Sequence, residues 1–133
     1  MASQDASEVA DALDGEVPTV DKIVEITEDN DANNLLGRPN SYESAAVIYD
    51  EAASCDMPGV DCGAVVESFG DEAAATARAE YIQTVLKEAP GLGSEWTYTK
   101  GSVLLRVSGQ LKPSAASEYE AAFDGEEVTA PAE

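Results

Sequence analysis

The chain has 133 residues, 44% of them hydrophobic, and a formal net charge of −20. That length is enough for one domain with its own core, and the hydrophobic content excludes a wholly disordered acidic polymer. The excess of acid repels phosphate backbones and anionic headgroups, and the sequence contains no basic patch, so nucleic acid is excluded as a partner.

The two ends of the chain are acidic and are predicted to be disordered. Residues 1–33 contain ten acids and one Lys, and residues 112–133 contain six acids and one Lys. Residues 1–17 are expected to form a disordered arm and residues 125–133 a disordered tail, because neither segment can bury enough apolar surface to offset its ordering entropy. Residues 18–124 then form the single domain.

The opening of the chain shows no membrane or export signal of its own. It lacks the charged start and the apolar segment of a signal peptide. No apolar run elsewhere approaches the roughly 18 residues of a membrane-spanning helix. An acidic opening rich in small residues suits a tether that follows a removed export signal.

Three strands and a helix are predicted in the first part of the domain. Runs rich in β-branched and small apolar residues predict strands over residues 20–27, 45–50 and 63–69. A helix is predicted over residues 71–89, because Asp71 can cap its start and a Pro-Gly pair stops it. The apolar residues at helical spacing along it are Ala74, Tyr81, Ile82, Val85 and Ala89.

The second part is predicted to contain a hairpin and a final helix. Residues 95–99 and 102–108 are strands around Gly101, which supplies the positive φ that a tight turn needs. Pro113 suits the first turn of a helix that reaches about Phe123. The order β-β-β-α-β-β-α favours an α+β fold, an antiparallel sheet of about five strands with the helices packed on one face.

The segment TEDNDANNLLGRPNSY, residues 27–42, has features of a calcium-binding loop. Asp29, Asp31 and Asn33 stand at alternate positions, as the first ligands of such a loop do. Two features oppose this interpretation. The twelfth position is Asn40, which cannot supply a bidentate carboxylate, and the preceding segment is a strand rather than a helix. No metal site is therefore assigned.

The same segment is more simply a connector between two strands. Gly37 stands where a short helical turn ends in the left-handed conformation, and a residue before Pro39 is extended. An Arg beside a proline-fixed loop can also bind a carboxylate, so the exposed polar groups of the connector are candidates for ligand binding. These candidate residues are Asn34, Arg38, Asn40 and Tyr42.

The chain contains no His, which removes the commonest general base and most zinc sites. No catalytic residue and no cofactor is assigned. Cys55 and Cys62 flank Pro58-Gly59, which folds the chain back, so we expect a structural disulfide; two unrelated reduced Cys are the alternative. For an eight-residue loop the chain-entropy model gives roughly 2.5 kcal/mol, and a disulfide would imply an oxidising compartment.

Arg78 falls within the apolar face of the predicted helix. A charge there must extend to solvent or find a carboxylate. Glu67 on the third predicted strand is one candidate partner. Structural pairing is therefore the favoured interpretation of Arg78, ahead of a catalytic role.

A resemblance to a known group of proteins rests on three segments of the chain: TEDNDANNLLGRPNSY, VVESFGDEAAATARAEYIQTV and YTKGSVLLRVSGQLKPSAASEYEAAF. Over about residues 24–123 the chain resembles a group of uncharacterised secreted lipoproteins of Gram-positive, mainly actinobacterial, bacteria. The motifs NLLGRP and VLLRVSG are the most specific parts. The resemblance implies export, an extracellular domain and a lipid anchor on an upstream Cys of the precursor. It implies no activity, and the present sequence lacks the lipobox Cys.

Three hypotheses for function follow. The first is an extracellular, cell-surface, lipid-anchored domain without enzymatic activity, which binds an unknown protein or small ligand and meets the membrane only through the anchor of its precursor. The second is a calcium-dependent surface module that uses Asp29, Asp31 and Asn33. The third is an enzyme with paired carboxylates such as Glu67 and Asp50.

Overall fold

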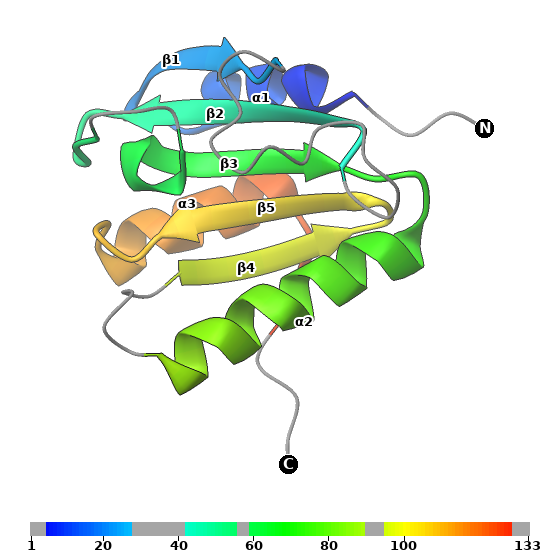
Figure 1. The fold of residues 1–133 in the computed structure, drawn as a ribbon. Coiled ribbons are helices and arrows are strands. Elements are labelled where there is room, and N and C mark those ends of the chain that lie inside the picture. The colour runs from blue at the N-terminus through cyan, green and yellow to red at the C-terminus, as the bar shows by residue number, and fades with distance from the viewer. Residues whose placement is uncertain (1–4, 28–41, 56–58, 90–94, 129–133) are drawn as a thin grey trace.

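The computed structural model of the chain describes residues 5–27, 42–55, 59–89 and 95–128. Within these ranges six strands form one antiparallel sheet in the order β1-β2-β3-β5-β4-β6, accompanied by three α-helices (Figure 1). The predicted α+β class is confirmed. The elements are α1 (Ala6–Glu16), β1 (Val20–Glu25), β2 (Ser44–Asp50), η1 (Val60–Cys62), β3 (Gly63–Ser68), α2 (Glu72–Glu88), β4 (Glu95–Lys100), β5 (Val103–Ser108), α3 (Pro113–Phe123) and β6 (Glu126–Glu127).

The helices cover both faces of the sheet, so the prediction that they pack on one face is wrong. In Figure 1, α2 crosses in front of the sheet while α1 and α3 lie behind it. Along β2, Ala46 and Ile48 belong to one core cluster and Val47 to the other. The physical reason is visible in β3, which is buried at every position. A strand that is apolar on both sides needs a cover on each side.

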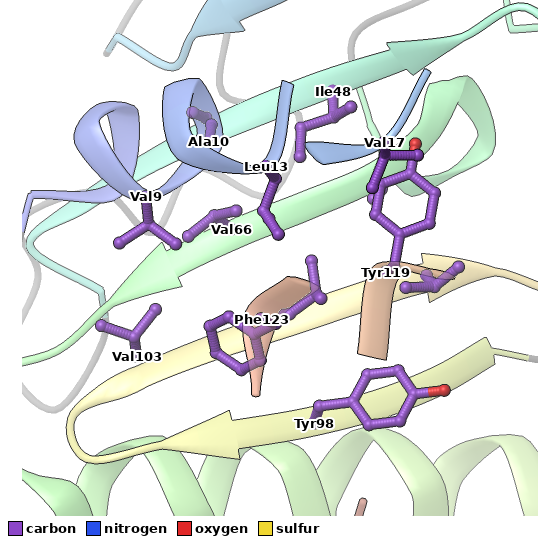
Figure 2. Packing of buried hydrophobic residues seen from close by; sticks show 14 of the residues in the cluster. Val9, Ala10, Leu13, Val17, Ile48, Val66, Tyr98, Val103, Tyr119 and Phe123 are labelled. Carbon is purple, nitrogen blue, oxygen red and sulfur yellow. The ribbon is translucent and has the colours of Figure 1, made fainter. Parts of the chain in front are cut away.

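We call these two surfaces the α1–α3 face and the α2 face. The core of the α1–α3 face includes Leu13, Ile48, Val66, Leu105 and Phe123, and part of it is drawn in Figure 2. The core of the α2 face includes Ile26, Tyr42, Val47, Phe69, Ala75, Ala79, Ile82 and Leu104.

The predicted disordered arm contains helix α1, and that prediction is wrong for residues 6–17. The carboxylate of Asp5 caps the helix by accepting from the Ser7 N–H at 2.8 Å. Small and branched apolar residues recur at helical spacing, while acids occupy the opposite side. The Ala6 N–H donates to Ser44 Oγ at 3.0 Å, which joins the start of α1 to β2. The buried residues of the helix are Ala6, Val9, Ala10 and Leu13.

The predicted disordered tail also pairs with the sheet at its start. Glu126 and Glu127 form β6 opposite Thr99 and Tyr98, and the Val128 N–H donates to the Thr97 carbonyl at 2.7 Å. The prediction is therefore wrong for residues 126–128, and residues 129–133 lie outside the described part. The outer strands of the described sheet are β1 and β6. Strand β1 has a bulge between Val20 and Lys22, and β6 is two residues long.

The helix and turn signals of the second half are confirmed. Asp71 caps α2 by accepting from the Ala74 N–H at 2.7 Å, and Pro113 opens α3. Gly101 adopts φ +60° in the β4–β5 hairpin. The predicted apolar face of α2 is rotated, however, because the buried residues are Ala75, Ala79 and Ile82, while the Tyr81 side chain is 61% exposed.

No helix in the described ranges is both long enough and apolar enough to cross a membrane.

Candidate functional site

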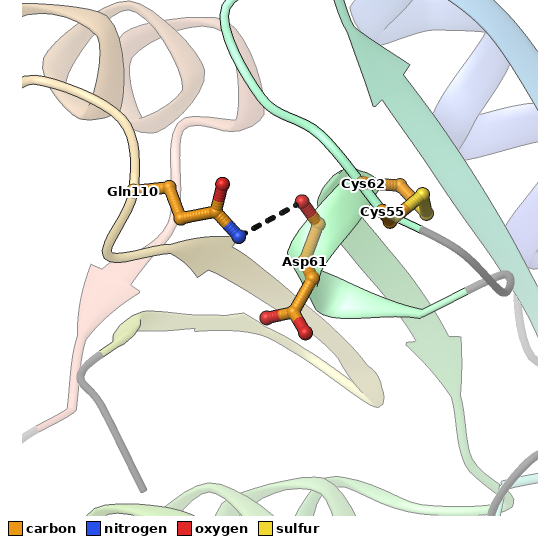
Figure 3. The surroundings of a disulfide bond; sticks show 4 residues. All are labelled: Cys55, Asp61, Cys62 and Gln110. Carbon is orange, nitrogen blue, oxygen red and sulfur yellow. Dashed lines mark hydrogen bonds between the residues drawn. A yellow bond between two sulfur atoms is a disulfide. The ribbon is translucent and has the colours of Figure 1, made fainter. Parts of the chain in front are cut away.

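The predicted disulfide between Cys55 and Cys62 is present, with a Cα–Cα distance of 4.9 Å. It closes the connection from β2 to β3, of which residues 56–58 lie outside the described part. Figure 3 shows the Gln110 side chain beside it, where Gln110 Nε2 donates to the Asp61 carbonyl at 3.4 Å. The disulfide loop is thus also joined to the link between β5 and α3.

Gly63, directly after the disulfide, cannot be replaced without a clash. Its φ is +149°, a conformation that side chains with a Cβ rarely adopt, and an added Cβ would lie 2.7 Å from Asp50 Cβ. The close approach of Gly63 to β2 lets the β2–β3 ladder begin immediately after the loop.

Asp50 is the buried carboxylate of the α1–α3 face, with 3% of the residue exposed. Its Oδ2 accepts from Thr19 Oγ1 and from the Tyr119 hydroxyl, both at 2.7 Å, and its Oδ1 accepts from the Ala52 N–H at 2.9 Å. Burial and the hydrogen bond to Asp50 raise the pKa of Tyr119, so its hydroxyl keeps its proton. Asp50 therefore connects the end of β2 to α3 and to the turn before β1.

Glu67 is the buried carboxylate of the α2 face, with 1% of the residue exposed. Its Oε1 accepts from Arg78 Nε at 3.3 Å, and its Oε2 accepts from Arg106 Nη1 at 3.1 Å. Arg106 also binds Glu95 with two parallel hydrogen bonds, Nε to Oε1 at 2.9 Å and Nη2 to Oε2 at 2.8 Å. We call these four residues the arginine–glutamate network.

The network joins α2 to three strands and is balanced in charge. Burial acts to lower the pKa of Arg106, but Glu67 and Glu95 outweigh it and raise that pKa. Each carboxylate oxygen of the network accepts from a guanidinium. Beside it, Gln83 Nε2 donates to Thr97 Oγ1 and to the Glu95 carbonyl. This arrangement is a structural crosslink, and the predicted pairing of Arg78 with Glu67 is confirmed.

Glu67 and Asp50 do not form a carboxylate pair. Glu67 stands opposite Ala45 on the α2 face, whereas Asp50 binds Tyr119 of α3 on the other side of the sheet. The hypothesis of an enzyme built on this pair is therefore wrong. Among the described residues there is also no group of three or more His, Cys, Asp or Glu that could hold a metal ion.

Most of the predicted ligand-binding residues lie outside the described part of the chain. This holds for Asn34, Arg38 and Asn40, and likewise for the proposed calcium ligands Asp29, Asp31 and Asn33.

Tyr42 is described, and it is not an exposed group. Only 1% of the residue is exposed, and its ring meets Phe69 edge to face with centroids 6.3 Å apart. Tyr42 comes two residues before β2, and its side chain packs in the α2-face core, which explains its burial.

Sequence reasoning missed the Arg106–Glu95 pair and the Tyr119–Asp50 hydrogen bond. One signal was present, because Arg106 interrupts the apolar strand VLLRVS and a charge there needs a partner.

A scan against protein-family models and searches of curated proteins and solved structures found no match to this chain.

Proposed function

We propose that this chain is the extracellular domain of an exported, lipid-anchored protein, and that it binds a ligand rather than catalysing a reaction. The observation that supports export is the Cys55–Cys62 disulfide, because disulfides persist in oxidising compartments and are rare in the cytosol. The resemblance of residues 24–123 to secreted lipoproteins points the same way, with the anchor on a Cys of the precursor.

The binding part of the proposal concerns the connector between β1 and β2. Ile26 and Tyr42, which flank residues 28–41, both pack in the α2-face core. The Ile26 N–H also donates to the Ala45 carbonyl at 2.9 Å. Binding residues concentrate on connections whose ends are held by a rigid scaffold. The proposal places ligand contacts at Asn34, Arg38 and Asn40, with an unknown protein or small molecule of the cell surface as the partner.

Export is tested on intact cells that produce the precursor. Protease added to the intact cells should degrade the protein while a cytosolic marker survives. In cells that have not been treated with protease, the protein made from the precursor should enter the detergent phase after detergent phase separation. A protein that resists protease until the cells are lysed contradicts export. A protein that is degraded but stays in the aqueous phase contradicts the anchor alone.

Binding is tested by capture from cell-envelope extracts with the immobilised chain. We expect Arg38→Ala to lose the captured partner and to unfold at the same urea concentration as the wild type. Lys87→Ala is the matched control, because it removes one exposed positive charge from the far end of α2. Equal capture by the two variants would contradict the role of Arg38.

The calcium-dependent alternative gives a different result in a thermal melt. A native-state calcium site at a hundred times its dissociation constant would add about 2.7 kcal/mol of stability. For a domain of this size that is a rise of roughly ten degrees in the melting temperature. We expect no change on adding calcium, and a rise that Asp29→Asn and Asp31→Asn abolish would favour the calcium module.

A further inference from the structure

A cavity of about 120 Å³ lies between the two helices of the α1–α3 face and the β4–β5 hairpin. In Figure 2, Val9 and Leu13 of α1 point toward the sheet, and Val103 and Phe123 lie nearby. All but one of the lining side chains are apolar. The lining residues are Val9, Ala12, Leu13, Lys100, Val103, Ala122 and Phe123.

The walls of this cavity are fixed by backbone geometry. Helix α3 ends at Phe123, because Asp124 adopts the left-handed conformation with φ 58° and its N–H donates to the Glu120 carbonyl at 2.8 Å. Gly125 then passes so close that an added Cβ would lie 2.7 Å from a carbon of the Phe123 ring. The backbone at Gly125 therefore packs directly against the Phe123 ring.

Lys100 is the charged residue of the lining, and its position is set by the tight turn at Gly101. Lys100 is exposed, whereas the two half-buried bases of the described ranges, Arg78 and Arg106, are paired within the arginine–glutamate network. Lys100 makes no ion pair with a described residue, although the chain contains 27 acids. An apolar space with an unpaired ammonium at its rim is complementary to an apolar group that ends in an anion.

We propose that this cavity binds a small monocarboxylate whose apolar part is about the size of a six-carbon chain or an aromatic ring. The size follows from the volume: this cavity of about 120 Å³ is about half open to solvent, and an enclosed apolar cavity of about 150 Å³ can hold benzene. Val9, Leu13 and Phe123 enclose the apolar part, and Lys100 Nζ binds the carboxylate. Lys100 is the charged side chain of the lining, and acids farther away than the Debye length of about 8 Å at physiological salt are largely screened.

This inference goes beyond the proposed function and does not depend on it. The cavity lies on the α1–α3 face, whereas Ile26 and Tyr42, on either side of residues 28–41, pack in the α2-face core. Loss of ligand binding here would leave the export and the connector proposal untouched.

The test is a titration of the full chain with hexanoate, followed by methyl NMR signals. We expect saturable shifts of the Val9, Leu13 and Val103 methyl groups, with a dissociation constant in the millimolar range that suits a ligand of about eight non-hydrogen atoms. 1-Hexanol, which has the same chain without the charge, should bind more weakly. No saturable shift up to about 10 mM hexanoate, or equal binding of the alcohol, would overturn the proposal.

Two variants locate the site. Lys100→Gln should weaken hexanoate binding about two- to five-fold, as expected for one exposed ion pair, and should leave 1-hexanol binding unchanged. The matched control Lys87→Gln, which removes a charge on the opposite face, should bind hexanoate like the wild type. Equal weakening by both lysine variants would overturn the role of Lys100. Ala122→Leu should fill the cavity and abolish binding of both ligands; retained binding in a folded Ala122→Leu variant would place the ligand elsewhere.

Discussion

Among the described residues, Asp50 and Glu67 are the two most deeply buried carboxylates, one on each face of the sheet, and their hydrogen bonds come from different kinds of donor. Asp50 on the α1–α3 face accepts from two hydroxyls and one backbone N–H, all of them neutral. Glu67 on the α2 face accepts from two guanidinium groups. Neutral donors leave the negative charge of Asp50 in place, whereas the arginine–glutamate network cancels its own charge. A buried carboxylate is thus held by neutral hydrogen bonds on the α1–α3 face and by salt bridges on the α2 face.

This difference predicts unequal costs when a partner is removed. Arg106→Met should destabilise the protein by about 3–5 kcal/mol, because Glu95 loses both of its charged hydrogen bonds and Glu67 loses one while both remain largely buried. Urea unfolding measures the change. The exposed Lys112→Met is the control and should stay within about 0.5 kcal/mol. A loss below about 1 kcal/mol for Arg106→Met would show that the network contributes little to the α2 face.

The α2 face also has a covalent crosslink, since Cys62 packs in its core. Replacing both Cys55 and Cys62 with Ala should cost about 2.5 kcal/mol by the chain-entropy model. Urea unfolding of the double variant gives the value. Thiol counting on the denatured wild type without reductant should find no free thiol, and two free thiols would contradict the disulfide.

Removing one neutral hydrogen bond to Asp50 on the α1–α3 face should destabilise the protein less than removing Arg106 from the arginine–glutamate network. Tyr119→Phe keeps the ring and removes one of the three hydrogen bonds to Asp50, which predicts a loss of about 2 kcal/mol. The matched control is Tyr81→Phe, which removes an exposed hydroxyl and should change the free energy of unfolding by less than about 0.5 kcal/mol. A loss for Tyr119→Phe that equals or exceeds that for Arg106→Met would reverse the comparison.

Arg78 lies at the rim of the network and should matter less than Arg106. Its side chain is 17% exposed, and Glu67 keeps Arg106 when Arg78 is absent. Arg78→Met should therefore destabilise by about 1 kcal/mol in the same urea experiment. If Arg78→Met instead cost as much as Arg106→Met, the network would depend on its rim, and its assignment as a buried crosslink centred on Arg106 would be wrong.

The smallest effect near neutral pH concerns Tyr98 and Tyr119, two tyrosines in the core of the α1–α3 face. Burial, with Glu120 and Glu127, raises the pKa of Tyr98 to about 12, and the pKa of Tyr119 is raised as well. Tyrosines of the unfolded chain ionise near pH 10, so above that value the unfolded state holds fewer protons and the free energy of unfolding falls as pH rises.

Urea unfolding at pH about 9 and about 11 tests this sign. The wild type should lose stability between the two values, and Tyr119→Phe should lose less, because one of the groups whose pKa is raised is gone. A slope that is the same in both proteins would exclude Tyr119 as a contributor.

Local signals predicted strands β1 to β5 and the helices α2 and α3 well, because each is encoded by neighbouring residues. Asp71 at a cap, Pro113 at a first turn and Gly101 in a hairpin act within four residues of their effect. Helix α1 escaped prediction because Ala6 and Ala10 are too small to mark an apolar face, although both are fully buried. Their burial is decided by the sheet that they meet.

The placement of side chains across the sheet was predicted poorly, because it depends on residues far apart in the sequence. Arg106 and Glu67 are separated by 39 positions, and Tyr119 and Asp50 by 69. A single sequence shows that a buried charge needs a partner, but it does not show which residue that partner is. For the same reason Tyr42 was expected at the surface, and the face of α2 was misplaced by about one residue.

The outer strands of the sheet determine how readily two copies of this chain would associate edge to edge. An open strand edge is a template for intermolecular pairing and aggregation, and natural proteins interrupt it with bulges, charges or short length. Here β1 has a bulge and exposes Asp21, Lys22 and Glu25, while β6 is only two residues long and both are Glu. Two copies meeting at β6 would bring like charges together. Neither of the outer strands β1 and β6 therefore offers a regular edge for fibril-like growth, and the protein should stay dispersed when concentrated at a surface.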